Sequence, residues 1–434
     1  MRRSAATLLI LLLTAALQST PSARDQLNDL QAKALAAANS GDQQSRIVAD
    51  LDLLRLLNNA PSVYEALARA YAAAGDTQRA LAALNHFADL GLSDDNLLNG
   101  ADKRLGPLEP LPEYKQILDR FRGNEAPISL GTPVLTLLDP GLLTEDIDYD
   151  PTTRTFLITS VLEHKIVRAA LSGTVTEFAA SPDKWPMLAI KTDTPRHRVW
   201  ATEVALDGFT AAPKADWGRS AVLCYDLTTG KLLRRIEGPP HSALGDMALT
   251  PSGDPIVSDG EGGSLYRLSG DTLRPINTTD FISPQTPVML PGDRILVPDY
   301  VRGLAILNLR TSHVLWLDGD KAALTGVDGV YVHNQQLLLT QNGTTPERVI
   351  LLNLDSSFSR IESTKIIEQA TPGLDDPTHG VIVGVDFSGA PSNGSSLLGW
   401  YYIANSGWSQ LDDHGDVKPG ARLTPSHILR YSLK

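Results

Sequence analysis

Residues 144–169 read TEDIDYDPTTRTFLITSVLEHKIVRA, in which an acidic corner leads into three short apolar strands joined by polar turns. A unit of this kind occurs six times, in steps of 40 to 57 residues, up to the end of the chain. A repeat of this length, made only of strands, is typical of a β-propeller. We therefore predict a mainly β fold, a six-bladed β-propeller over residues 126–434. The units begin at the corner residues Asp146, Ala189, Asp246, Thr286, Asp328 and His379.

The two longest steps are explained as loop insertions, and the second and sixth units each carry one before their third strand. They cover residues 207–219 and 407–426 and are rich in Gly, Pro and Asp. Trp217 and Trp408 lie in these segments. Aromatic side chains on such loops either wall a substrate cleft or anchor the loop.

A strand-like run, PVLTLL at residues 133–138, stands before the first full repeat. A propeller has to join its first and last blades, because it otherwise leaves an unpaired sheet edge. We expect this run to form the outermost strand of the last blade, beside residues 428–433.

Residues 24–125 favour helices, because apolar residues recur there at spacings of three and four. The unit from Pro61 to Gly91 resembles a tetratricopeptide repeat, with Gly75 and Asp76 at the turn between two antiparallel helices. A helical region of this kind either caps the propeller or offers a groove to a protein partner.

Residues 1–23 have the features of a secretory signal peptide, with Arg2 and Arg3 before a short apolar run and small residues after it. The apolar run is too short to span a bilayer comfortably, and no other segment qualifies. We expect a secreted or periplasmic protein with no membrane span in the mature chain. The single cysteine, Cys224, cannot form an internal disulfide, and we expect it to be buried.

The formal net charge of −12 argues against nucleic acid and anionic membrane surfaces as partners. The sequence contains no phosphate-binding loop, zinc-protease helix or nucleophile elbow. The corner and strand-end residues are therefore the candidates for a functional site. Their oxygen-rich side chains suit a hard divalent cation; alternatively, each Asp caps a turn and ties adjacent blades together. Besides the corners, the set includes Glu145, Gln285, Thr378, Ser160, Glu203, Asp259, Asp299, Gln341, Asn342 and Asn405.

Three corners resemble the blade openings of the gluconolactonase, senescence-marker-protein and luciferin-regenerating-enzyme-like propellers. The motifs are 144–150, 283–285 followed by 299–303, and 326–329. In that family a Glu, an Asn and an Asp from separate blades bind one divalent metal ion, which activates water against a sugar lactone. The resemblance places the metal ligands at Glu145 and Asp328. The third ligand falls on a corner where this chain has Gln285, followed by Thr286 and Pro287, instead of an Asn-Gly pair.

The resemblance thus implies a hydrolase of a lactone or related ester, dependent on calcium, manganese, magnesium or zinc, with a small-molecule substrate. It places Asp246, after Gly245, at the substrate-side corner of a middle blade, as general base or supporting carboxylate. His379 is a further candidate for a base or substrate contact, although a lone His near a Gly turn is often structural. The alternative is a non-catalytic propeller that binds a small molecule or a protein.

Overall fold

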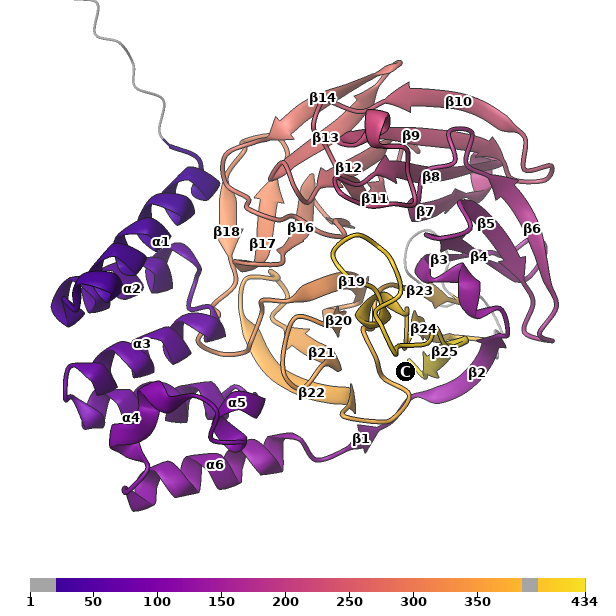
Figure 1. The fold of residues 1–434 in the computed structure, drawn as a ribbon. Helices are drawn as coiled ribbons and strands as arrows, with labels where there is room; N and C mark the ends of the chain where they lie inside the picture. The colour runs from indigo at the N-terminus through magenta and orange to yellow at the C-terminus, as the bar shows by residue number, and fades with distance from the viewer. Residues whose placement is uncertain (1–20, 385–396, 434) are drawn as a thin grey trace, which may run out of the picture.

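The computed structural model describes residues 21–384 and 397–433, and it shows the six-bladed β-propeller that the repeats predict. Six sheets stand around a central axis (Figure 1). All six predicted corner residues lie within two positions of the start of the first strand of a blade. The repeat pattern therefore located every blade of the propeller.

The first four blades are built from strands consecutive in the chain. Their bounds are β3 (Thr144–Asp150), β4 (Thr155–Ser160), β5 (Lys165–Ala169) and β6 (Val175–Ala180); β7 (Met187–Asp193), β8 (Arg198–Ala205), β9 (Arg219–Asp226) and β10 (Leu232–Glu237); β11 (Leu244–Leu249), β12 (Pro255–Asp259), β13 (Ser264–Ser269) and β14 (Thr272–Asn277); β15 (Val288–Leu290), β16 (Arg294–Asp299), β17 (Gly303–Asn308) and β18 (Val314–Trp316).

The last two blades each include a strand from before the first repeat. The fifth holds β19 (Val327–His333), β20 (Gln336–Gln341), β21 (Arg348–Leu354), β22 (Ile361–Gln369) and β1 (Ile128–Ser129). The sixth holds β23 (Gly380–Val383), β24 (Gly399–Ile403), β25 (Ser426–Tyr431) and β2 (Thr132–Leu137).

Ring closure occurs as predicted, because β2 pairs antiparallel with β25 as the outermost strand of the sixth blade. Leu135 lies opposite Ile428, and Leu137 lies opposite Ser426. The segment at residues 123–131, which reads as a linker by composition, adds β1 to the edge of β22 instead. The chain thus passes from the helices through the fifth blade into the sixth before it starts the first.

The middle strands of the blades are buried on both faces, because each blade is packed between two neighbours. β4 and β16 each have only their first residue partly exposed. Apolar side chains of adjacent blades share clusters, such as Ile158 of β4 with Ile403 of β24. Burial on both faces explains why these strands read as nearly continuous apolar runs.

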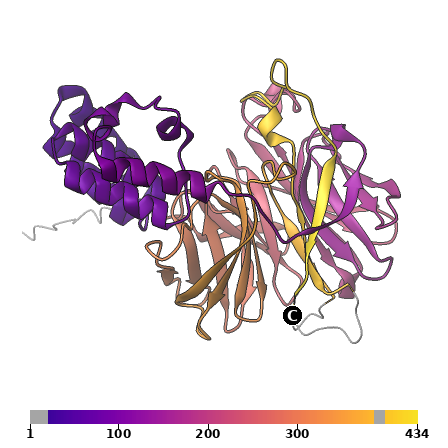
Figure 2. The same cartoon turned by 90° about the horizontal axis from the view of Figure 1, so that it is seen from below.

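Both predicted insertions precede the third strand of their blade, at residues 206–218 and 404–425. They contact each other: the Thr210 amide donates to the carbonyl of His414 (2.8 Å), and the rings of Phe209 and Trp408 lie 5.8 Å apart. We call these two segments together the loop wall. It projects from one end of the propeller (Figure 2).

The helical region consists of two helix pairs, followed by two short helical turns and a last helix as long as each helix of the second pair. Gly75, with a φ of 79°, ends one helix, and the Asp76 side chain caps the next, so the predicted turn is confirmed. Short connections of this kind make neighbouring helices antiparallel. The helices are α1 (Ala23–Ser40), α2 (Gln43–Leu56), α3 (Pro61–Ala73), α4 (Thr77–Asp89), α5 (Asp95–Leu98) and α6 (Pro112–Asn124), with a 3₁₀ helix at Lys103–Leu108.

The helices pack against the propeller (Figures 1 and 2). Their apolar core continues into the fourth and fifth blades through Ile282 and Ala323. Arg302 donates to the Leu56 carbonyl (2.9 Å), and the buried Arg348 donates to the Leu90 carbonyl (3.2 Å). The structure therefore shows the contact with the propeller that is expected of a cap, and a groove for a protein partner stays a prediction.

Residues 1–20, which hold most of the predicted signal segment, lie outside the described residues, so secretion stays a prediction. No helix within residues 21–384 and 397–433 is long and apolar enough to cross a membrane. Cys224 is buried and unpaired, as expected.

Candidate functional site

A β-bulge opens the first strand in most blades and directs the corner residue. The strand register shifts between Thr144 and Ile147, and between Val327 and Val330. A bulge adds an unpaired residue and re-aims its side chain. A hydroxyl on the second strand holds the bulge: Thr159 accepts from the amide of Asp146, at 2.9 Å. Threonines 202 and 340 accept in the same way from Ala189 and Gly329.

Two corner residues and the neighbour of a third meet at one point. Ligand atoms of Glu145, Asp328 and His379 all lie within 4.8 Å of one another, although they come from the first, fifth and sixth blades. Asp328 and His379 are buried, with 8% and 1% of their surface exposed. The predicted pair of Glu145 and Asp328 is therefore brought together, with His379 beside it.

Each of the two carboxylates has one oxygen held by a neutral donor. The Trp408 indole N–H donates to Oε2 of Glu145, and Nδ2 of Asn342 donates to Oδ2 of Asp328 at 3.1 Å. The other oxygen of each makes no hydrogen bond with any of the described residues. Two carboxylate oxygens thus remain available for a ligand.

The pKa values of these carboxylates are high. Burial raises the pKa of Glu145 to about 8, and the Asp328 carboxylate contributes to this shift. Burial likewise raises the pKa of Asp328 to about 7, with Asp246 and Asp376 adding repulsion. Desolvation and like charges disfavour the ionised forms, and a cation between them would favour ionisation.

His379 is fixed through both of its ring nitrogens. Nε2 lies 2.5 Å from Oδ1 of Asp246 and 2.8 Å from the Thr286 hydroxyl, while Nδ1 lies 3.0 Å from the backbone carbonyl of Glu145. Since a carbonyl only accepts, Nδ1 carries a proton. Burial alone would lower the pKa of His379, but the carboxylates of Asp246, Asp146 and Asp328 outweigh it and raise that pKa well above 6.5.

Asp146, another predicted corner, has a structural role. Its Oδ2 accepts from the amide of Ile190 at 2.8 Å and from the ammonium of Lys191 at 2.6 Å. Both partners belong to the second blade. This carboxylate therefore ties adjacent blades together, as the alternative reading of the Asp corners expects.

Gln285 directly precedes Thr286 in the chain, and its side-chain amide is turned toward Ser283. Nε2 donates to the carbonyl (3.3 Å) and hydroxyl (3.1 Å) of Ser283. The next residue, Thr286, contacts the cluster and donates to Oδ1 of Asp246 at 2.9 Å. A ligand role for Gln285 stays a prediction.

Most strand-end candidates hold turns or neighbouring strands. Asp299 accepts from the amides of Ile282 and Val301, and Glu203 accepts from the Ser181 hydroxyl and pairs with Arg235. The remaining ones that make such contacts are Ser160, Asp259, Gln341 and Asn405. Asn342 is the member of this group that contacts the cluster.

The two loop tryptophans differ in role. Trp217 donates to the carbonyls of Phe209 (3.1 Å) and Ala212 (3.2 Å) and anchors its own loop. Trp408 packs against Phe209 and donates to Glu145, so it belongs to the site. The repeat pattern did not reveal this contact, because it joins a loop to a strand start 263 residues away.

The donor set fits a divalent cation. Two carboxyl groups lie at one point, each with an oxygen free of hydrogen bonds, and burial and mutual repulsion raise their pKa values. Such oxygens are ligands of the type that Ca²⁺, Mg²⁺ and Mn²⁺ prefer. Both nitrogens of His379 already have partners. The carboxylates of Glu145 and Asp328 are therefore the groups that could hold a cation, and cation binding stays a prediction.

No protein-family model matches the sequence, and no curated protein does so at a significant level. The structure is similar to several solved propellers. A calcium-binding protein, regucalcin, from Agrobacterium tumefaciens is 17% identical, with 70% of this chain and 97% of that chain covered and a TM-score of 0.47. A gluconolactonase from Xanthomonas campestris is 14% identical, with 68% and 88% covered and a TM-score of 0.46.

A PQQ-bound aldose sugar dehydrogenase from Streptomyces coelicolor is similar to the same degree. It is 15% identical, with 70% of this chain and 99% of that chain covered and a TM-score of 0.46. Proteins of the kind that the sequence motifs resemble are thus among the structural neighbours. At these identities the likeness concerns the fold and does not extend to a reaction.

Proposed function

We propose that the chain is a divalent-cation-dependent hydrolase of lactones or related esters. The observation that carries the proposal is the meeting of Glu145, Asp328 and His379 within 4.8 Å at the corners of three blades. Glu145 and Asp328 hold the cation in this proposal. A divalent cation bound there would polarise the ester carbonyl and ready a water molecule for attack.

The chain's own residues supply position and proton transfer. Trp408 and Asn342 fix one oxygen of each carboxylate and so direct the other toward the shared point. Asp246 and the Glu145 carbonyl orient the imidazole of His379. An oriented imidazole is suited to general acid–base catalysis.

The reaction is a simple hydrolysis. The oxygen of water bonds to the carbonyl carbon, the ring C–O bond breaks, and one proton passes from the water to the leaving oxygen. His379, whose raised pKa keeps it protonated, would give a proton to the leaving oxygen, and the Asp246–His379 pair would take one back from the water. Asp246 keeps the ring oriented and compensates its positive charge, which is the supporting role considered for this carboxylate.

The test combines metal binding with turnover. The purified chain is titrated calorimetrically with Ca²⁺, Mn²⁺, Mg²⁺ and Zn²⁺, and proton release is followed with a panel of γ- and δ-lactones. We expect binding of one ion per chain, and we expect Asp328→Asn to lose at least tenfold in both cation affinity and turnover. Glu163→Gln, which removes a carboxylate from a turn of the same blade as Glu145, is the control.

Absence of turnover with every cation, in a protein that folds normally, would contradict the proposal. If no lactone is turned over and Asp328→Asn has the same cation affinity as the wild type, the non-catalytic binding propeller is favoured instead.

A further inference from the structure

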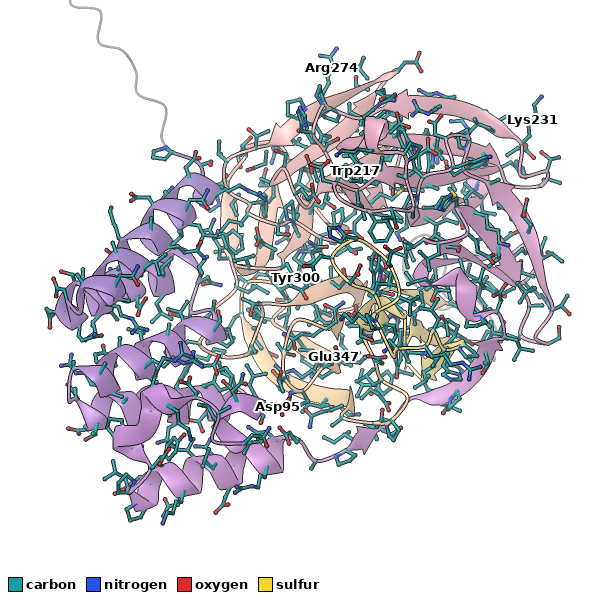
Figure 3. The ribbon with its side chains drawn as sticks, viewed as in Figure 1. Asp95, Trp217, Lys231, Arg274, Tyr300 and Glu347 are labelled. Carbon is teal, nitrogen blue, oxygen red and sulfur yellow. The ribbon has the colours of Figure 1, made fainter. Side chains whose placement is uncertain are left out.

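A cleft of about 730 Å³ opens between the helical region and the propeller. Figure 3 labels Asp95, Tyr300 and Glu347, which line it where the two parts meet. The helical wall comes from α3, α4 and the segment that includes α5, and the other wall comes from turns of the fourth and fifth blades. The volume lies within the range of small-molecule sites.

The cleft is connected to the candidate site by two hydrogen bonds. The Tyr300 hydroxyl donates to Oδ1 of Asn342 at 3.0 Å, and Nδ2 of Asn342 donates to Oδ2 of Asp328 at 3.1 Å. Both Tyr300 and Asn342 line the cleft. One side chain therefore separates the cleft from a carboxylate of the site.

The other side of the site is covered. The loop wall packs on itself, and its Trp408 contacts Glu145 directly. The helices contact the third, fourth and fifth blades, whereas the loop wall comes from the second and sixth. A ligand that reaches Asp328 by way of the cleft would thus lie between the helices and Asn342.

The lining of the cleft is acidic. It includes Glu65, Asp94, Asp95 and Glu347, and none of its lining residues is a Lys or an Arg. Arg69, behind the helical wall, pairs with Asp94 (3.4 Å) and Asp102 (2.6 Å) and lies 3.9 Å from Glu65. Asp95 and Glu347 have no ion pair with any of the described residues. A cationic group would therefore be attracted to this cleft and an anionic group repelled.

We propose that this cleft binds the substrate of the hydrolase and that its carboxylates select lactones or esters that carry a positive charge. The inference rests on the proposed function. Burial raises the pKa of Glu65 to about 8 and that of Glu347 to about 7, so the charge preference is to be measured above pH 8, where both carboxyls are ionised. The helical region thus provides specificity in addition to its contact with the propeller.

The test uses three γ-butyrolactones that carry a trimethylammonium group, no charge or a carboxylate. We expect kcat/KM to be at least tenfold higher for the cationic lactone than for the anionic one. In a double variant, Asp95→Asn with Glu347→Gln, this ratio should fall at least fivefold. Asp119→Asn removes an exposed carboxylate of α6 outside the cleft and should leave the ratio unchanged.

Binding of the corresponding trimethylammonium lactam, which resists hydrolysis, is measured by calorimetry on the metal-free protein. We expect the double variant to bind it at least tenfold more weakly than the wild type does. If lactones are hydrolysed without charge preference, the cleft inference is overturned while the proposed function stands. If the lactam binds as expected and no lactone is hydrolysed, the proposed function fails and the charge selectivity of the cleft stands. If neither occurs, both are overturned.

Discussion

Asp246 and His379 lie 133 residues apart in the chain, yet Oδ1 of the first and Nε2 of the second are 2.5 Å apart. The third and sixth blades face each other across the channel, so this contact spans the ring. Closure of the propeller is therefore a condition for the contact to exist. The pair also connects the stability of the fold with the protonation of the site.

The pKa of His379 should depend on Asp246. Because the folded-state pKa is raised above 6.5, the proton on His379 contributes stability that is fully present below about pH 6.5 and is lost as pH rises through the raised pKa. Asp246→Asn removes the nearest carboxylate and should lower this pKa by at least about one unit. Imidazole NMR titration measures it, with His379→Gln used to assign the signal; an unchanged pKa would contradict the relationship.

Metal-free protein should lose stability as pH rises from about 4 to 8. In the fold, the pKa values of Glu145 and Asp328 are raised to about 8 and about 7, so the folded state binds more protons than the unfolded chain in this window. We expect the melting temperature to fall across it, and millimolar Ca²⁺ or Mn²⁺ to raise the melting temperature more at pH 8 than at pH 5.

Glu145→Gln should flatten that slope, because the amide does not titrate. The half-buried turn variant Glu163→Gln should keep the wild-type slope. Equal slopes in all three proteins would show that the carboxylate cluster does not control the pH dependence.

The closing strand offers a matched pair of neighbouring leucines. Leu137 is fully buried in β2, whereas the side chain of Leu138 is 79% exposed. Leu137→Ala should lower the free energy of unfolding by about 2–5 kcal/mol, because it leaves a cavity between the sixth and first blades. Leu138→Ala should change it by less than about 0.5 kcal/mol. Denaturant unfolding measures both, and similar values for the two would argue against the role of this strand in closure.

Docking of the helices should depend on Arg348. This buried guanidinium donates to Gln341 at 2.7 Å and to the carbonyl of Leu90 at 3.2 Å. Arg348→Met leaves these acceptors unpaired, at a cost of about 1–3 kcal/mol. We expect faster hydrogen exchange in peptides of α4 and α5, and no such change for Arg360→Met, an exposed arginine of the same blade. Unchanged exchange in Arg348→Met would show that the apolar contacts alone hold the helices.

The resemblance at three corners led to Glu145 and Asp328 because ligand residues stand at fixed positions in a blade. It did not settle the third position. Gln285 folds onto Ser283, and Thr286 reaches Asp246 instead. The direction of a short side chain at a bulge depends on the local hydrogen bonds, which the repeat spacing does not encode.

The repeat length, the apolar runs and the strand before the first repeat were sufficient to determine the blade count, the closing strand and the helical region, since these depend on local periodicity and on the need to pair sheet edges. Only the tertiary structure decided which polar residues share an environment. Asp146 and Asp328 look alike as corners in the sequence, but one pairs with Lys191 and the other lies beside Glu145 and His379. The reason is physical: burial, charge and hydrogen bonding at the channel depend on side chains from different blades, and the chain brings them together only when the ring closes.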